Sequence, residues 1–259
     1  MDAGGQRHRR RHLDAEDGAT RVETFGDGAG WLLDRAPRLF GCEDDVTGFD
    51  PAAAPLRDLW RRHRQRRILR TGTLWHDLAC LVVQQRVSRV DAAAQWRRLV
   101  TTHGSPTPGV PGLWTPPSPA VLGRLSSPDL HRLGVERRRA QTLVGAAVAL
   151  ARHQDLADGD APAGTAALRT VPGIGPWTTG CLAGLTWGDP DAVITGDSGI
   201  PSLVAWVLAG QRRADDATML DLLAPYPPHR YRVLGLLMAS GRRPPRQAPR
   251  SRREGITRR

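Results

Sequence analysis

Two short stretches of the chain carry the residue types most capable of chemistry: a turn with two glycines, and a single acid downstream of it. The turn lies in the segment Leu168-Arg-Thr-Val-Pro-Gly-Ile-Gly-Pro-Trp-Thr-Thr-Gly180. Gly173 and Gly175 can adopt backbone angles that other residues avoid, and Pro176 suits the first position of a helix. The segment therefore predicts two helices joined by a tight turn, with free amide N–H groups at the start of the second helix. Such an arrangement can bind an anion such as a phosphate.

The acid is Asp197, which follows Trp177 by 20 residues in the sequence Gly196-Asp-Ser-Gly199. A carboxylate held in one place can stabilise positive charge that develops during a reaction. The same aspartate precedes an apolar stretch, which is where a helix N-cap belongs. The two roles are compatible, because a capping aspartate is held rigidly at the helix start. Asp189 and Asp191 are the competing acids nearby, and we expect them to shape a turn around the proline between them.

The glycine turn also permits interpretations without catalysis. A Gly-x-Gly pair followed by an acid about twenty residues later matches part of a dinucleotide-binding fingerprint. The spacing is not Gly-x-Gly-x-x-Gly, however, and the preceding residues 164–169 have helical rather than strand character, which disfavours that interpretation. A purely structural turn between packed helices stays open on local sequence.

Composition bounds the class of protein. The chain has 259 residues and a net charge of +11, and all 37 of its basic residues are arginine. A cation excess of this size favours a polyanionic partner, although a GC-rich genome would account for the choice of arginine over lysine. Cys42, Cys80 and Cys181 lie far apart, so we expect no disulfide framework, zinc site or iron–sulfur cluster, and a cytoplasmic location. No apolar run approaches the ~20 residues of a membrane span.

Helical patterns dominate from residue 51 to 240, and the fold class expected is all-α with about ten short helices. Helices are expected near residues 56–67, 74–84, 88–104, 128–134, 135–150, 164–170, 203–208, 214–223 and 229–239, and two more are expected to start at residues 119 and 176. A linker is expected over 154–162, and a loop over 104–118. Residues 1–21 and 241–259 are basic and without pattern, which predicts a disordered arm and a disordered Arg/Pro-rich tail.

A second turn, Gln84-Gln-Arg-Val-Ser88, separates two of the expected helices. Ser88 is placed to cap the second helix, with Asp91 three residues further on in a capping-box pattern. On local sequence alone, Gln84 and Gln85 are simply polar residues at a helix C-terminus.

Taken together, these stretches resemble the helix-hairpin-helix DNA glycosylases, and most of all the 3-methyladenine DNA glycosylase II branch. The resemblance rests on the strings Val171–Thr178 and Gln84–Ser88, on the acid at Asp197, and on the pattern of Leu133, Gly134, Arg139 and Ala140. It covers residues 22–240. It implies a helical glycosylase core over 51–240, preceded at 22–50 by at most a fragment of the family's β-rich N-terminal domain, with a strand at residues 21–25.

The resemblance also implies roles for individual residues. Asp197 would be catalytic, and Arg86 would fill the gap left by a flipped nucleotide. The base pocket would be lined by Trp177, Tyr226 and Met238, with Tyr231 nearby. Contacts with DNA would come from Gln84, Gln85, Arg86, Ser88, Gly173, Ile174, Gly175 and Thr178. Backbone carbonyls of Arg169, Val171 and Ile174 would hold a monovalent cation, Na⁺ or K⁺, and no other cofactor would be required.

The activity implied is excision of alkylated purines from double-stranded DNA by base flipping and hydrolysis, carried out by a cytoplasmic, nucleoid-associated monomer. Because the chain contains no lysine, it lacks the side-chain amine that lyases of this superfamily use to form a Schiff base. Trp177 stands where the endonuclease III-like branch has that lysine. The alternative is a non-enzymatic protein that binds DNA lesions, because Ser198-Gly199 follows the acid where the family usually has an aromatic residue.

Overall fold

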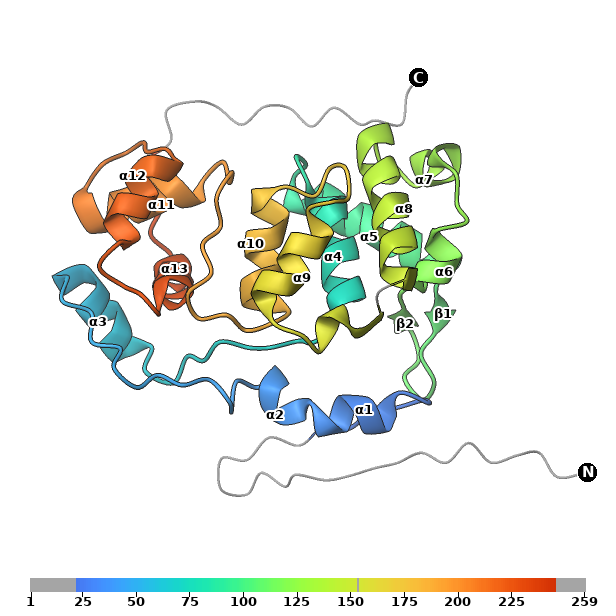
Figure 1. Cartoon of the computed structure of the whole chain (residues 1–259), viewed down its shortest axis with the longest axis horizontal. Coiled ribbons are helices and arrows are strands. Elements are labelled where there is room, and N and C mark those ends of the chain that lie inside the picture. The colour runs from blue at the N-terminus through green and yellow to red at the C-terminus, as the bar shows by residue number, and fades with distance from the viewer. Residues whose placement is uncertain (1–21, 153, 246–259) are drawn as a thin grey trace, which may run out of the picture.

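The computed structural model describes residues 22–152 and 154–245, so the expected arm at 1–21 and most of the expected tail lie outside the described residues. The described part of the chain forms thirteen α-helices, one short 3₁₀-helix and a two-stranded hairpin (Figure 1). The all-α fold class expected from the sequence is confirmed. The helices divide between two hydrophobic cores, and the segments that carry the candidate site lie between them.

The first lobe contains the central part of the chain, at the middle and right of Figure 1. It consists of α4 (Leu74–Gln84), α5 (Arg89–His103), α6 (Pro119–Leu122), α7 (Ser127–Arg132), α8 (Arg137–Arg152), the 3₁₀-helix (Gln154–Ala157), α9 (Ala161–Leu168) and α10 (Pro176–Leu185). Its core includes Leu78 of α4, Leu143 of α8 and Leu182 of α10, none of which has measurable exposure. Helix α4 is apolar on most sides because it packs against α5, α8 and α10.

The second lobe joins an N-terminal helix to the last three helices. It consists of α3 (Ala54–Arg62), α11 (Ile200–Ala209), α12 (Asp216–Leu223) and α13 (Arg230–Ala239), on the left of Figure 1. Leu56, Val204, Met219 and Leu234 are buried in its core. Because the chain leaves this lobe after α3 and returns after α10, the connection from α10 to α11 runs between the two lobes.

The segment before α3 joins the lobes and contains no strand from Val22 to Phe25, contrary to the sequence-based expectation. It forms α1 (Ala29–Asp34) and α2 (Ala36–Leu39) and runs beneath both lobes (Figure 1). Asp44 makes a buried ion pair with Arg232 of α13 at 2.7 Å. Phe49 packs edge-on against Trp60, with ring centroids 5.1 Å apart. These contacts make 44–49 part of the second lobe's core.

Smaller differences follow from local chemistry. Strands β1 (Ser105–Pro106) and β2 (Trp114–Thr115) pair within the expected loop 104–118. The expected linker at 154–162 contains the 3₁₀-helix and the start of α9. Ser126 caps α7, because its hydroxyl accepts the Asp129 amide and the Asp129 carboxylate accepts the Ser126 amide in return. Ser88 caps α5 as expected.

Candidate active site and DNA-contacting turns

The expected hairpin is present between α9 and α10, and glycine fixes its conformation. Gly173 has φ +90°, and a Cβ at this position would lie 2.0 Å from Oγ1 of Thr142. No other residue type fits there without displacing α8. Val171 and Ile174 are buried on either side of the turn, and the Ile174 amide donates to the Val171 carbonyl at 3.1 Å. The apolar residues therefore anchor the turn, and the glycines leave its tip bare.

The start of α10 offers unused hydrogen-bond donors. Gly175 is the N-cap residue, and nothing lies within 4 Å of where its Cβ would be. Among the described residues, no backbone carbonyl accepts the amides of Gly175, Trp177 or Thr178. The first turn of α10 contains no acidic residue. These amides and the positive end of the helix dipole can bind an anion.

Asp197 is held by three hydrogen bonds in the connection between the lobes. Its Oδ2 accepts the indole N–H of Trp177 at 2.9 Å. Its Oδ1 accepts the amides of Gly199 at 2.7 Å and Ile200 at 2.8 Å, which start α11. Because both oxygens are engaged, the plane of the carboxylate is fixed. The N-cap residue of α11 is Gly199 and not Asp197. Asp197 lies two residues earlier and accepts the first amides of the helix from there, and its side chain is partly exposed.

The loop before Asp197 is held from the second lobe. Gly196 has φ +76°, and its amide donates to Oδ2 of Asp216 at 2.8 Å. The other oxygen of Asp216 is buried and has no partner among the described residues. Asp216 was not singled out in the sequence, because its contact is with a residue 20 positions earlier and no local pattern marks it.

The competing acid Asp191 has a structural role, because its carboxylate is paired with Arg230. Burial opposes its ionisation, but hydrogen bonds from Arg230 and the charge of that guanidinium together hold the pKa of Asp191 below its ordinary value. The two side chains form an ion pair at 2.5 Å. This contact joins the α10–α11 connection to the start of α13, so Asp191 shapes the loop, as expected from its place beside Pro190.

Cys181 lies one turn after Trp177 on α10 and packs against both cores. Burial, with a smaller contribution from the charge of Asp197, raises the pKa of its thiol to about 12. Burial likewise raises the pKa of Tyr231 to about 12. Both groups are therefore neutral near pH 7, and neither offers an anionic nucleophile next to Asp197.

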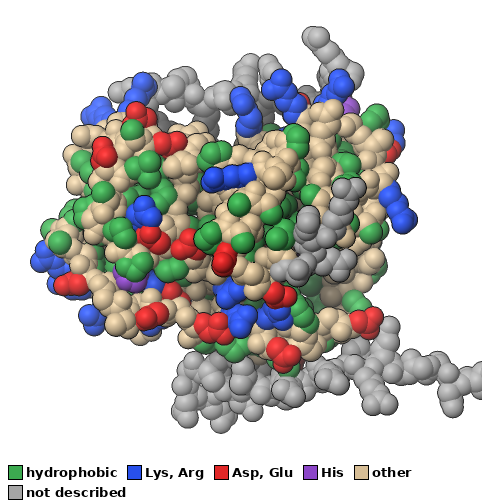
Figure 2. Space-filling view, in the orientation of Figure 1, with side chains coloured by type: hydrophobic (Ala, Val, Ile, Leu, Met, Phe, Trp, Pro, Cys, Tyr) green, Lys and Arg blue, Asp and Glu red, His purple; other side chains and the backbone are tan. Residues whose placement is uncertain are grey.

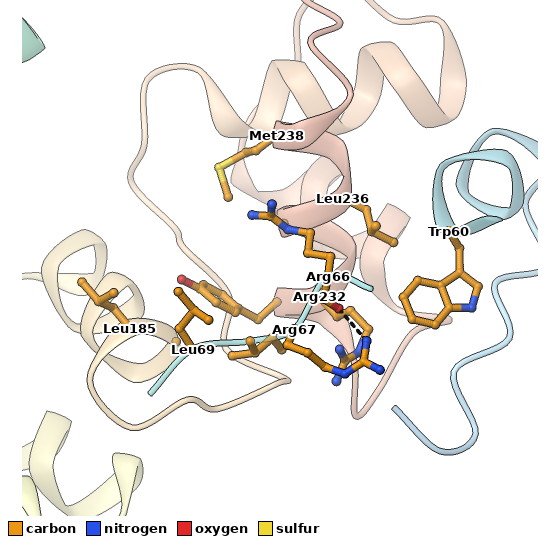
Figure 3. Close-up of a pocket in the computed structure, with 12 residues that line it drawn as sticks. Trp60, Arg66, Arg67, Leu69, Leu185, Arg232, Leu236 and Met238 are labelled. Atoms are coloured by element: carbon orange, nitrogen blue, oxygen red, sulfur yellow. Dashed lines mark hydrogen bonds between the residues drawn. The ribbon is translucent and has the colours of Figure 1, made fainter. Parts of the chain in front are cut away.

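A pocket of about 210 Å³ opens between α10, α13 and the segment 66–69. Figure 3 shows Met238 on α13 and Leu185 on α10 bordering the same space, with Arg66 and Leu69 of the connecting segment between them. Tyr231 also lines the pocket and lies directly over Gly184, where a Cβ would be 2.1 Å from its ring.

Of the residues predicted to line a base pocket, Met238 lines this pocket together with Tyr231, but Asp197 and Trp177 do not, so the base pocket stays a prediction. Tyr226 packs against the second core and is not among the residues that line this pocket. Trp177 packs against both cores, and its N–H is committed to Asp197. The structure therefore gives Trp177 a role that its position in the sequence did not indicate: it orients the carboxylate.

The second turn, at 84–88, follows α4. Arg86 is exposed and has φ +57°, the one positive value for a residue other than glycine in the described part of the chain. Gln84 is also exposed, and its amide returns to the Cys80 carbonyl of its own helix at 3.2 Å. The Ser88 hydroxyl is engaged with Asp91 at 2.5 Å. Arg86 is therefore the side chain of this turn that projects without a partner among the described residues.

Gln85 joins the two turns. Its side-chain amide donates to the Gly173 carbonyl and to the Thr178 hydroxyl, both at 3.0 Å. Thr178 is only 1% exposed, so its side chain serves this junction, and only its backbone N–H can face DNA. Ile174 is equally limited to backbone contacts, because its side chain is buried.

The predicted cation site consists of neutral carbonyl oxygens, which suit a hard monovalent ion. The Val171 carbonyl already accepts the Ile174 amide, whereas the carbonyls of Arg169 and Ile174 accept no backbone amide among the described residues. The Arg169 side chain folds away onto the Thr179 hydroxyl at 3.3 Å. No group of three or more His, Cys, Asp or Glu side chains suited to a metal occurs in residues 22–152 and 154–245. Two of the three predicted carbonyls thus have no backbone partner among the described residues, and the cation site stays a prediction.

The arginines do not gather in one patch on the face shown in Figure 2. They are scattered over the face and its edges, with one group near its lower edge, and acidic and apolar side chains lie between them. No helix in the described residues is long and apolar enough to cross a bilayer.

Known proteins share this fold. No family model matches the chain. A 3-methyladenine DNA glycosylase from Archaeoglobus fulgidus superposes with a TM-score of 0.68 at 16% identity, over 86% of this chain and 78% of that one. An 8-oxoguanine glycosylase/lyase from Clostridium acetobutylicum, bound to double-stranded DNA, gives 0.66 at 12% identity, over 86% and 77%.

The chain therefore has the fold of these DNA glycosylases. In sequence it is similar to a Mycobacterium tuberculosis protein described as a probable bifunctional transcriptional activator/DNA repair enzyme AlkA, with 32% identity over 136 residues. The aligned region covers 51% of this chain and 27% of that protein. The chain thus spans about a quarter of the length of the curated relative.

Proposed function

We propose that this protein is a monofunctional DNA glycosylase that removes alkylated purines of the 3-methyladenine type from double-stranded DNA. The observation that carries the proposal is the fixed carboxylate of Asp197. It lies between the two lobes and is oriented by the indole of Trp177. Trp177 belongs to the first turn of α10, where the hairpin ends and the free amides lie. The hairpin amides would bind a DNA phosphate and the Asp197 carboxylate would stabilise positive charge, and Trp177 connects the two.

The hairpin binds the backbone of the DNA. A phosphate accepts the free amides at the start of α10, and the bare glycine turn allows the strand to approach. A monovalent cation on the carbonyls of Arg169 and Ile174 adds positive charge beside that phosphate. Arg86 enters the duplex from the adjacent turn and occupies the space of the extruded nucleotide.

The chemical step needs a good leaving group and a stabilised sugar cation. In an alkylated purine the base is positively charged, so the N-glycosidic bond breaks with its electron pair moving to the base. The cation left at C1′ is stabilised by the Asp197 carboxylate. A water oxygen then bonds to C1′ and releases its proton, which leaves an abasic site. No lysine is present to form a Schiff base, so the strand stays intact.

Tyr231 and Met238 line a pocket that neither Trp177 nor Asp197 lines, so we do not assign the base to that space. The flipped base stacks instead on the ring of Trp177, whose face attracts a cationic base, worth ~0.5–2 kcal/mol. The indole N–H of the same residue holds Asp197 at 2.9 Å. Trp177 therefore links recognition of the base to orientation of the carboxylate.

Product analysis tests this proposal. Duplex DNA treated with a methylating agent is incubated with wild type and with Asp197→Asn, and free bases are identified by mass spectrometry. We expect release of 3-methyladenine or 7-methylguanine and formation of abasic sites by the wild type alone. Binding of the damaged duplex without release of any base would identify a non-enzymatic lesion-binding protein. A covalent complex trapped by borohydride would identify a lyase.

A further inference from the structure

Arg139 of α8 is a buried charge that the proposed reaction does not use. The side chain is 5% exposed. Its Nη1 donates to the Val83 carbonyl at 2.7 Å and to Oε1 of Gln95 at 2.8 Å. Gln95 is itself only 3% exposed. Burying a guanidinium carries a desolvation penalty that only well-placed hydrogen bonds offset. The groups to which Arg139 donates therefore indicate its role.

Those groups belong to the two helices on either side of the Arg86 turn. Val83 lies in the last turn of α4, two residues before Gln85, and Gln95 lies on α5, which begins just after the turn. The last carbonyls of a helix have no partner within it, and a cation at this end also complements the helix dipole. One guanidinium therefore fixes the end of α4 relative to α5.

Arg86 needs such support because its backbone is strained. A left-handed conformation costs a residue other than glycine about 1–2 kcal/mol, and the turn at 85–88 contains no glycine that could adopt it freely. Gln85 holds the turn on the hairpin side through Gly173 and Thr178. Arg139 supplies a second contact, from α8 to the Val83 carbonyl at the end of α4.

We propose that Arg139 is a positioning residue that holds the Arg86 turn in the conformation required for insertion into the duplex. The inference rests on the proposed function, because it assumes that Arg86 replaces a flipped nucleotide. Arg139 itself does not touch DNA. Its removal should therefore slow the extrusion of a paired base and leave the chemistry on a base that is already unpaired largely unaffected.

The substrates are two duplexes with one 7-methylguanine, placed opposite cytosine in the first and opposite an abasic-site analogue in the second. A base without a partner is easier to extrude. For Arg139→Met we expect single-turnover release to fall about 10- to 100-fold on the first duplex, which is the cost of a small misplacement in a site. On the second duplex it should fall less than about threefold.

The exposed neighbour Arg138 supplies the matched control, because Arg138→Met removes the same charge from the same helix. It should leave both rates within about twofold of wild type, since exposed substitutions away from special features have small effects. Arg139→Lys keeps a cation that can reach the Val83 carbonyl and should recover part of the rate on the paired substrate. Gln95→Met keeps the Val83 contact and should show an intermediate loss. If Arg139→Met does not fold, the rates of Arg139→Lys and Gln95→Met on the two duplexes test the same proposal.

Hydrogen exchange gives a readout of the turn itself. In Arg139→Met and Gln95→Met, the amides of 85–88 should exchange faster, while those of the second lobe should be unchanged. An equal loss of rate on both duplexes, or a loss as large in Arg138→Met, would overturn the proposal. A wild type that releases no base from either duplex would instead overturn the proposed glycosylase function, so the two failures are distinguishable.

Discussion

Two turns of the first lobe, the hairpin at 169–175 and the Arg86 turn at 85–88, lie next to each other and are joined by hydrogen bonds from Gln85. Each has a residue with positive φ, but the residue type at that position differs. The hairpin places glycine at the position with φ +90° and proline at the first residue of α10. The Arg86 turn places an arginine at φ +57°. The first conformation is encoded locally. The second is supported by hydrogen bonds with residues far away in the sequence, from Gln85 to the hairpin and from Arg139 to Val83.

The residue type at each positive-φ position matches what the turn exposes: backbone in the hairpin, and a long side chain in the Arg86 turn. In the function that we propose, the hairpin offers a bare backbone to a phosphate, and glycine provides that at no steric cost. In the same proposal, the Arg86 turn presents a long side chain at its tip, which glycine would remove. The strain of the left-handed arginine is offset by the hydrogen bonds of Gln85 to the hairpin and of Arg139 to the end of α4.

The largest effect on stability is expected at the hairpin. Gly173→Ala would place a methyl group 2.0 Å from Oγ1 of Thr142 at a backbone angle that alanine rarely adopts. We expect the free energy of unfolding to fall by about 2–4 kcal/mol in urea denaturation. Gly175→Ala is the matched control, because nothing lies within 4 Å of its Cβ position. Similar stabilities for the two variants would show that the hairpin does not depend on this close approach.

A smaller effect is expected at the link between the turns. Gln85→Ala removes both hydrogen bonds to the hairpin and leaves the buried Thr178 hydroxyl without that partner. We expect a loss of about 1–2 kcal/mol in the free energy of unfolding. Gln84→Ala should cost less than about 0.5 kcal/mol, since this exposed side chain bonds only to its own helix. Equal costs for the two substitutions would mean that the turns are independent of one another.

The smallest effect on stability, and one of opposite sign, is expected at the tip. Arg86→Gly relieves the left-handed strain, so the free energy of unfolding should be unchanged or raised by up to about 1 kcal/mol. Release of a paired alkylated base should nevertheless fall about tenfold or more, because the inserted side chain is lost. Calorimetry and single-turnover rates on the same preparation check this combination. A clear loss of stability would show that the arginine side chain supports the fold rather than DNA insertion.

The same contrast explains what could be predicted from the sequence. The hairpin, the buried helix α4 and the cap at Ser88 depend on residues adjacent in the chain, and their positions were predicted closely. The link from Gln85 to Gly173 spans 88 residues, and the contact of Arg139 with Val83 spans 56. Such pairings follow from how helices pack, and no local spacing indicates them.

The remaining differences have the same origin. The strand expected at residues 21–25 had no partner strand, and the described part of that segment packs instead beside short helices. Tyr226 was grouped with Met238 because both are large residues near the C-terminus, but Tyr226 precedes α13 and packs against the second core. Tyr231 and Met238 are seven residues apart on α13 and share one face, so helical periodicity was the available signal for that pair.

In the proposed function, the turns bind and position DNA while Asp197 performs the chemistry. Two quantities measured in wild type and Asp197→Asn test this division: the single-turnover rate of 7-methylguanine release, and the affinity for a duplex with an abasic-site analogue. We predict that the rate falls about 10²- to 10³-fold or more, the range for loss of one transition-state stabiliser, while the affinity stays within about threefold. A rate within about tenfold of wild type, or parallel losses of rate and affinity, would contradict it.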